Sequence, residues 1–175
     1  MRSKKIVNKR TARKLSKSWL GILILIILAG YYFYQEYKPI EPGERFLVTL
    51  KKCVDGDTAW FYIDEKEVKV RFLYIDTPES TKEIEPYGVA ASEFVADKLE
   101  SAKQIELELN VDGNQYDKYD RLLAWIFVDG ELLQEEIARN GYCKGFYDYD
   151  YQYTYKKQIL KAHEDAKKNH RGIYQ

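Results

Sequence analysis

Carboxylates and arginines gather at the ends of strand-like runs in three short segments. Residues 54–58 read V-D-G-D-T, residues 71–79 read R-F-L-Y-I-D-T-P-E, and residues 117–121 read D-K-Y-D-R. A divalent ion held by carboxylates, together with guanidinium groups, can share the negative charge that develops on phosphoryl oxygens. These residue types therefore indicate metal-assisted attack on a phosphodiester.

Two aspartates are the candidate ligands of the ion. Asp57 follows the Asp55-Gly56 turn, and Asp76 ends a predicted strand. Hard cations such as Ca²⁺ prefer carboxylate and carbonyl oxygens, and two strand ends of one barrel can converge on a single ion. Taken by itself, Asp-Gly-Asp is better explained as a hairpin turn, so the interpretation depends on the other segments.

The sequence around Glu79 and the two arginines indicates that these residues belong to a functional site. Pro78 fixes its own φ and favours an extended residue before it, which would hold the Glu79 carboxylate rigidly. Arg71 falls inside an apolar strand, where a cation is costly unless it is partnered. Because guanidinium groups bind phosphate as a planar fork, Arg71 and Arg121 are candidate phosphate ligands. The plainer alternatives are an exposed loop glutamate and a solvated turn arginine.

Together, the three segments resemble the signature of the staphylococcal-nuclease-like (thermonuclease) family, over about residues 46–174. The resemblance implies calcium-dependent cleavage of DNA and RNA with little sequence preference, leaving 3′-phosphate ends. It implies that Ca²⁺ is held by Asp57, Asp76 and the Thr77 carbonyl, that Glu79 is the general base, that Arg71 and Arg121 grip the scissile phosphate, and that Lys118, Tyr119 and Tyr147 contact the nucleotide.

Two features depart from the family pattern. The loop over residues 80–85 is short, so part of the substrate rim is expected to differ, and the second departure is at residue 120. Asp120 stands where the family commonly has glycine, between the tyrosine and the arginine. Aspartate tolerates left-handed backbone better than most residues, so we expect the turn to survive. Its negative charge beside Arg121 is expected to weaken phosphate binding.

The intervening segments predict a small barrel. Strands are expected within residues 46–75 (three, as a meander), 104–110, 122–128 and 142–147, and helices over 86–102, 131–140 and 154–169. This order fits a mainly β fold with helices, an OB-fold five-stranded barrel with three helices, and the resemblance implies the same fold.

The formal net charge of zero hides an asymmetry. Residues 1–18 carry eight Lys and Arg and no acid, which leaves a net charge of −8 for the remainder. Polyanion binders usually show a basic footprint, so this balance is the main observation against a nuclease. Two alternatives therefore stay open: a nuclease-derived module that binds nucleic acid or a protein at the cell surface, and a structural envelope protein whose acidic face binds Ca²⁺ or basic partners.

An uncharged run over residues 19–34 follows the basic segment, with aromatic residues at both edges. It predicts a transmembrane signal anchor over 19–35, after a basic cytoplasmic tail at 1–18 and before a linker at 36–45 and the domain at 46–175. The alternative is a cleaved signal peptide and a secreted domain. In both cases the acidic domain is expected outside the cytoplasm, and no obligate protein partner is implied.

The remaining candidates have plain interpretations. Cys53 and Cys143 either pair outside the cytoplasm or are two small buried residues. His163 and His170 lie away from every motif and are expected to be structural or solvated. Tyrosines recur at every second position over residues 147–155 and are expected to pack or form a rim, while Tyr147 either joins them or stacks on substrate.

Overall fold

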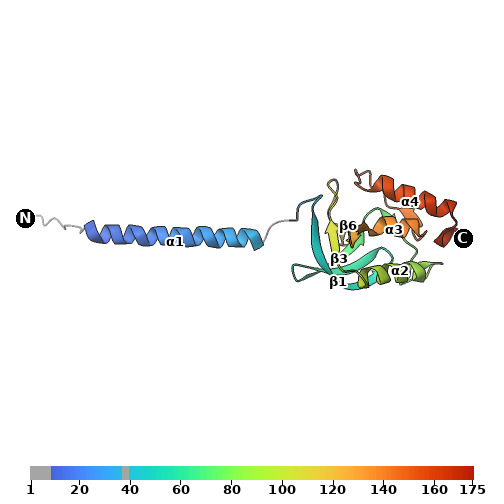
Figure 1. Ribbon diagram of the computed structural model, residues 1–175, viewed down its shortest axis with the longest axis horizontal. Helices are drawn as coiled ribbons and strands as arrows, with labels where there is room; N and C mark the ends of the chain where they lie inside the picture. Colours follow the sequence, from blue (N-terminus) through green and yellow to red (C-terminus); the bar gives the residue numbers. More distant parts are fainter. Residues whose placement is uncertain (1–8, 37–39) are drawn as a thin grey trace, which may run out of the picture. The chain divides into compact units, whose positions relative to one another are not determined.

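The computed structural model describes the backbone of residues 9–36 and 40–175. It divides into two units, residues 1–39 and residues 40–175. In the first unit, helix α1 runs over Lys9–Glu36 (Figure 1). Residues 1–8 of the predicted tail and 37–39 of the predicted linker lie outside the described residues.

Helix α1 contains the segment that was predicted to cross a membrane, residues 19–35. In the part of the chain that the structure describes, no helix has both the length and the apolar character that a membrane span requires. The uncharged run covers only residues 19–34, whereas a span needs about 20 apolar residues. The predicted transmembrane helix is therefore not supported. The extracytoplasmic location of the acidic domain stays a prediction.

The second unit is built on a closed five-stranded barrel, which confirms the predicted OB-like fold. Its strands are β1 (Arg45–Asp55), β2 (Thr58–Ile63), β3 (Lys66–Phe72), β5 (Ile105–Glu108) and β6 (Leu122–Val128). The first half of β1 pairs with β5 and its second half with β2, both antiparallel. Strand β6 pairs antiparallel with β5 and parallel with β3, and this second pairing closes the barrel.

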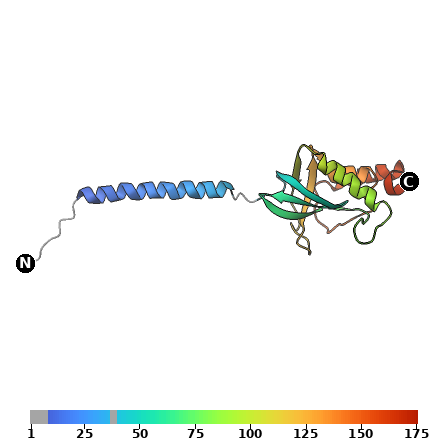
Figure 2. The same ribbon diagram turned by 90° about the horizontal axis from the view of Figure 1, so that it is seen from below.

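Three helices of this unit lie together on one side of the barrel (Figures 1 and 2). They are α2 (Gly88–Glu100), α3 (Leu133–Arg139) and α4 (Lys156–Lys168), followed by a 3-10 turn, η1 (Gly172–Tyr174). The helix expected from residue 131 starts later, because β7 (Glu131–Leu132) first pairs with β6. Two short strands, β4 (Ile75–Asp76) and β8 (Gly145–Phe146), pair with each other.

The barrel core is apolar, and the side chain of Gln134 that is buried against it has hydrogen-bond partners. All seven residues of β6 are buried. Gln134 of α3 is fully buried, where its amide donates to the Ala124 carbonyl at 3.0 Å and accepts from the Ile126 N–H at 3.1 Å. Helix α3 is thus held on β6 at no cost in unpaired polar groups. Cys53 and Cys143 are both free, in agreement with the unpaired interpretation.

Candidate active site

A cleft of about 600 Å³ brings the candidate residues together. Eight of the nine line it: Asp57, Arg71, Asp76, Glu79, Lys118, Tyr119, Arg121 and Tyr147. The ninth, Thr77, is buried and contacts Asp57. The three motifs and the distant tyrosine therefore share one cavity, as the resemblance implied. The chemical role of each residue stays a prediction.

Asp57 is fixed by a network that joins the first motif to the second. Its Oδ2 accepts hydrogen bonds from the Thr77 N–H at 3.1 Å and the Thr77 hydroxyl at 3.2 Å. Its Oδ1 accepts from the Thr58 hydroxyl at 3.0 Å. Gly56 permits this approach, because a Cβ at that position would lie 2.7 Å from Thr77 Oγ1. The glycine of V-D-G-D-T is thus required by packing against D-T-P-E.

Arg71 lies between the two aspartates. It is only 7% exposed, and its Nη2 lies 2.9 Å from Asp57 Oδ2 and 3.6 Å from Asp76 Oδ1. Its Nη1 donates to the Phe72 carbonyl at 2.8 Å. The expectation that a strand arginine needs partners is confirmed, because a buried cation is tolerated only when paired and hydrogen-bonded. The arginine also holds the two carboxylates near one another.

Arg121 is held by Asp117, a residue that was not singled out from the sequence. The Arg121 Nε donates to Asp117 Oδ2 at 2.7 Å, and the backbone N–H groups of Arg121 and Tyr119 donate to Oδ1 at 3.0 and 2.9 Å. Burial alone would raise the pKa of Asp117, but the hydrogen bonds from these N–H groups and from the Arg121 side chain lower it overall. Asp117 therefore stays ionised and orients the guanidinium.

The turn at Asp120 keeps a left-handed backbone, as was expected for aspartate at a position where the family commonly has glycine. Asp120 has a φ of 57°, in the left-handed region that glycine favours. Aspartate is one of the residues that enter this region most readily. Arg121 forms its ion pair with Asp117, and the expected weakening of phosphate binding by Asp120 stays a prediction.

The backbone of Glu79 is fixed at both of its polar groups, while its side chain is exposed at the cleft. The Glu79 N–H donates to Glu85 Oε2 at 2.7 Å, and the Glu85 N–H donates to the Glu79 carbonyl at 2.9 Å. Gly88 packs against the same carbonyl, because a Cβ at that position would lie 2.0 Å from the oxygen. The short loop before α2 thereby positions the predicted base.

Lys144 connects this loop to the aspartates. Its Nζ lies 2.5 Å from Glu85 Oε2 and 3.8 Å from Asp76 Oδ2. Burial opposes the charge on Lys144, but the hydrogen bond to Glu85 and the nearby Asp76 raise its pKa overall. The same hydrogen bond lowers the pKa of Glu85. Sequence reasoning missed this pair because its members lie 59 residues apart and belong to no motif.

We expect Lys144→Met to reduce kcat by up to about 10²-fold, because misplacing a reacting group by about 1 Å costs that much. The mutation frees Glu85, which then no longer fixes the backbone of Glu79. Steady-state cleavage kinetics of the full chain measure the effect. Lys161→Met, on the exposed side of α4, is the matched control and should leave kcat unchanged. Equal kcat values in both variants would refute a positioning role for Lys144.

The carboxylates of the cleft repel one another. The Asp57 N–H donates to Asp55 Oδ1 at 3.0 Å, so the Asp55 carboxylate lies against the backbone of residue 57. Burial and the neighbouring Asp57 raise the pKa of Asp55 to about 6. Burial also raises the pKa of Asp76. A cation bound here would relieve this repulsion.

The donor chemistry fits Ca²⁺. Asp57 and Asp76 offer carboxylate oxygens and Thr77 offers a backbone carbonyl, which are the ligands that this ion prefers. Within the described ranges, no three or more His, Cys, Asp or Glu side chains form a ready cluster for a metal. A bound ion would therefore complete its shell with the carbonyl, water and substrate oxygens, as hard cations commonly do.

We expect Asp55→Asn to stabilise the domain at pH 7 in chelator by about 1–3 kcal/mol. The folded pKa of about 6 lies above the unfolded value of about 3.9. The wild type therefore loses stability as the pH rises from about 4 to 6. The variant does not, because asparagine has no carboxyl group to ionise. Urea unfolding at pH 4 and pH 7 measures the difference. Asp64→Asn, in an exposed turn, is the control. A gain of equal size at both pH values would contradict the electrostatic explanation.

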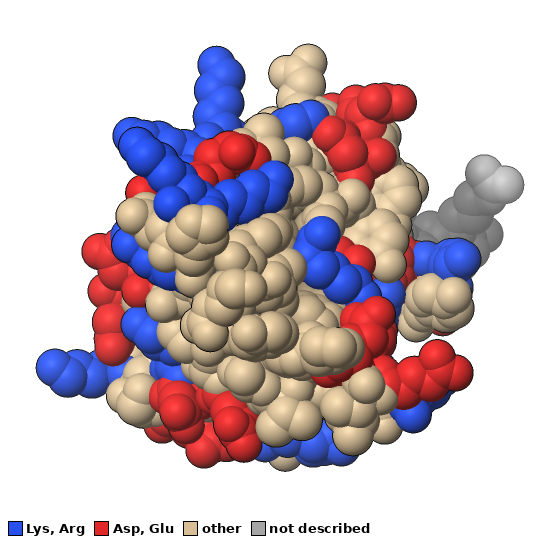
Figure 3. Space-filling view, turned by 90° about the vertical axis from the view of Figure 1, so that its right-hand side faces the viewer, with Lys and Arg blue, Asp and Glu red and all other residues tan. Residues whose placement is uncertain are grey.

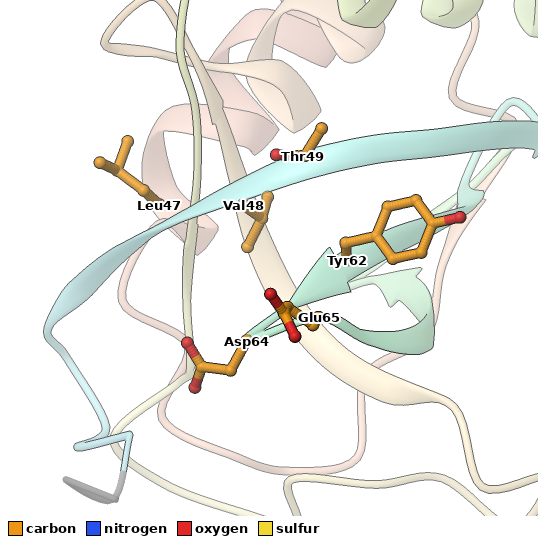
Figure 4. Close-up of a pocket in the computed structure, with 6 residues that line it drawn as sticks. All are labelled: Leu47, Val48, Thr49, Tyr62, Asp64 and Glu65. Carbon is orange, nitrogen blue, oxygen red and sulfur yellow. The ribbon is translucent and has the colours of Figure 1, made fainter. Parts of the chain in front are cut away.

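A second hollow of about 520 Å³ lies between β1 and the β2–β3 turn (Figure 4). Its lining residues are Leu47, Val48, Thr49, Tyr62, Asp64 and Glu65. Two of these six are acidic and none is basic, so the hollow presents no group that would attract phosphate. The first cleft is therefore the candidate site.

A closed OB-like barrel with arginines and carboxylates in one cleft defines a class of protein suited to phosphodiester chemistry. The family of Staphylococcal nuclease homologues matches residues 69–175. The chain belongs to this family.

Curated relatives agree with this assignment. Endonuclease YncB of Bacillus subtilis is 36% identical over 131 residues, which cover 73% of this chain and 61% of that protein. The SPbeta prophage-derived endonuclease YokF of the same organism is 37% identical over 131 residues, or 43% of its length. The chain thus spans less than two thirds of these two proteins. A thermonuclease of Staphylococcus intermedius is 30% identical over 173 residues, covering 92% of this chain and 99% of that protein.

Proposed function

We propose that the protein is a calcium-dependent endonuclease that hydrolyses DNA and RNA with little sequence preference and leaves 3′-phosphate ends. The observation that carries the proposal is that Arg71, Arg121 and Glu79 line one cleft with two aspartates, in a chain that belongs to a nuclease family. The endonuclease names of the relatives support it.

The proposed mechanism assigns one task to each group of residues. Glu79 takes a proton from the attacking water, a contribution of about 10²–10⁴-fold in rate. Arg71 and Arg121 donate to the phosphoryl oxygens as their charge grows, and their carboxylate partners hold both guanidinium groups in place. Lys118, Tyr119 and Tyr147 hold the nucleotide. A Ca²⁺ held by Asp57, Asp76 and Thr77 would supply Lewis-acid polarisation of the phosphate.

Substrate affinity must come from the cleft rather than from a broad basic surface. The described domain is acidic in its balance, and the face in Figure 3 carries Lys and Arg interspersed with Asp and Glu around a middle of other residues. Counterion release from phosphates scales with the number of basic contacts, so few contacts give a weak salt dependence. We expect modest affinity that depends on the ion and on the two arginines.

Cleavage assays of the full chain test the proposal. Plasmid, single-stranded DNA and RNA are incubated with Ca²⁺, with Mg²⁺ and with chelator, and the product termini are identified by their response to a 3′-phosphatase. We expect cleavage of all three substrates with Ca²⁺ alone and termini that carry 3′-phosphate. A folded protein that cleaves none of them would refute the proposal.

The acidic balance favours one competing function, a catalytically weak nuclease-derived module that binds nucleic acid or a protein. Such a module has no use for a general base, whereas the structure fixes the backbone of Glu79 from two sides. Binding without cleavage in the assay above would be the result that supports it.

A further inference from the structure

The cleft has an aromatic wall that the mechanism above does not use. Tyr116 and Tyr151 line the same cavity as the arginines and aspartates. The Tyr116 side chain is 52% exposed, and Tyr151 is half-buried. An exposed aromatic ring beside a phosphate site is a candidate surface for stacking on a nucleotide base.

The wall continues the row of rings that begins at the phosphate site. The Tyr147 ring lies 5.2 Å from the Arg71 guanidinium carbon. Its neighbour Tyr149 is 6.3 Å away by ring centroids and tilted by only 10°, and Tyr151 follows at 5.9 Å. The buried Tyr153 anchors the segment, because its hydroxyl accepts from the Tyr149 N–H and donates to the Tyr147 carbonyl. The rings are thus held in position before any ligand binds.

Tyr116 lines the same cleft from a second chain segment. The two segments meet where Tyr151 covers Gly113, since a Cβ at that glycine would lie 2.3 Å from the ring. Asn110 ties them together through its side-chain amide, which donates to the carbonyls of Asp112 and Gln152 at 2.8 and 3.1 Å. Two loops distant in sequence are therefore tied together, and each contributes one tyrosine, Tyr116 or Tyr151, to the lining of the cleft.

We propose that Tyr116 and Tyr151 form a second base-binding site, which takes an unpaired base of the same strand beyond the nucleotide at the scissile phosphate. This inference rests on the proposed nuclease function and extends it to a further position along the substrate. Stacking is tolerant of sequence because every base has an aromatic face.

The aromatic faces of these rings suit a base rather than a phosphate. Asp112 accepts from the Gln152 N–H at 2.8 Å next to Tyr151, and Asp148, between Tyr147 and Tyr149, pairs with Lys156. Asp148 is therefore balanced by a cation, and Lys82 and Lys118 also line the cleft. The preference for a base thus comes from the ring faces and not from the local charge. The bases of an intact duplex stack on one another, so the site selects unpaired strands.

Equilibrium binding of labelled oligothymidylates to the full chain tests the site. The Glu79→Gln background prevents cleavage, and fluorescence anisotropy with Ca²⁺ gives the Kd of a dinucleotide and of an octanucleotide. We expect the octanucleotide to bind more tightly. Adding Tyr116→Ala should reduce this advantage by at least about fivefold, while Tyr116→Phe should retain it.

A matched control removes a tyrosine elsewhere. Tyr62 is 38% exposed in the separate hollow of Figure 4, so Tyr62→Ala should leave the advantage of the octanucleotide unchanged. An unchanged advantage in Tyr116→Ala, or an equal loss for both oligonucleotides, would overturn the proposal. The wild type can also cleave nothing and still bind the octanucleotide more tightly than the dinucleotide, with an advantage that Tyr116→Ala reduces. In that case the second site stands and the nuclease function fails.

Discussion

We expect Glu79→Gln to lower kcat for DNA cleavage by about 10²–10⁴-fold, the usual contribution of a general base. The amide is close in shape to the carboxylate but cannot take a proton from water. The loop should keep its geometry, because its contacts with Glu85 and Gly88 involve the backbone of residue 79. Single-turnover cleavage with saturating enzyme measures the chemical step, and thermal unfolding checks the fold.

Glu83→Gln is the control for this result. Glu83 lies in the same loop and is exposed, and it does not line the cleft. The substitution makes the same change in charge and should leave kcat within about twofold of the wild type, as surface changes usually do. If Glu79→Gln also turned over at the wild-type rate, another group would have to be the base.

We expect Arg121→Ala to lower kcat by about 10²–10³-fold, the cost of removing one donor to a developing oxyanion. Arg121→Lys should recover little of this loss, because an ammonium cannot replace the planar fork. The fold should survive, since Asp117 keeps its hydrogen bond from the Tyr119 N–H. Single-turnover rates of the two variants measure the effect.

Arg139→Ala is the matched control for the arginine. Arg139 pairs with Glu135 on α3. As in the Arg121–Asp117 pair, the two members are four residues apart, so both alanine variants break an ion pair of the same spacing. The residue is not among those that line the cleft. We expect unchanged kcat in this variant. Similar losses in Arg121→Ala and Arg139→Ala would mean that the effect is not specific to the site.

The alternation of residues predicted the strands, and the resemblance to the thermonuclease family implied the closed barrel and the gathering of the motifs in one site. Alternation of apolar residues specified the strands, and Asp55-Gly56 marked the turn between β1 and β2. Arg71 was identified because it is a cation inside an apolar strand, where it needs partners. The structure then brought Asp57, Asp76 and Glu79 to one cleft.

The supporting residues could not be predicted, because their effect depends on distance in space. Lys144 meets Glu85 only after β8 pairs with β4, and neither residue belongs to a motif. In the sequence, Asp55 has the pattern of an ordinary turn residue. Its burial, which raises its pKa, is seen only in the structure. The predicted span over 19–35 rested on hydropathy, on the aromatic residues at its edges and on the basic segment before it, and the uncharged run is short for that purpose.

The calcium dependence of cleavage, compared between the wild type and Asp76→Asn, is the most direct test of the central claim. The rate is measured over a calcium titration that starts in chelator. We predict no cleavage without calcium in either protein, full recovery in the wild type, and at least about tenfold more calcium for half-maximal rate in the folded variant, in line with the loss of a ligand. Cleavage that persists in chelator, or identical titrations for the two proteins, would contradict the assignment of this cleft as a calcium-dependent active site.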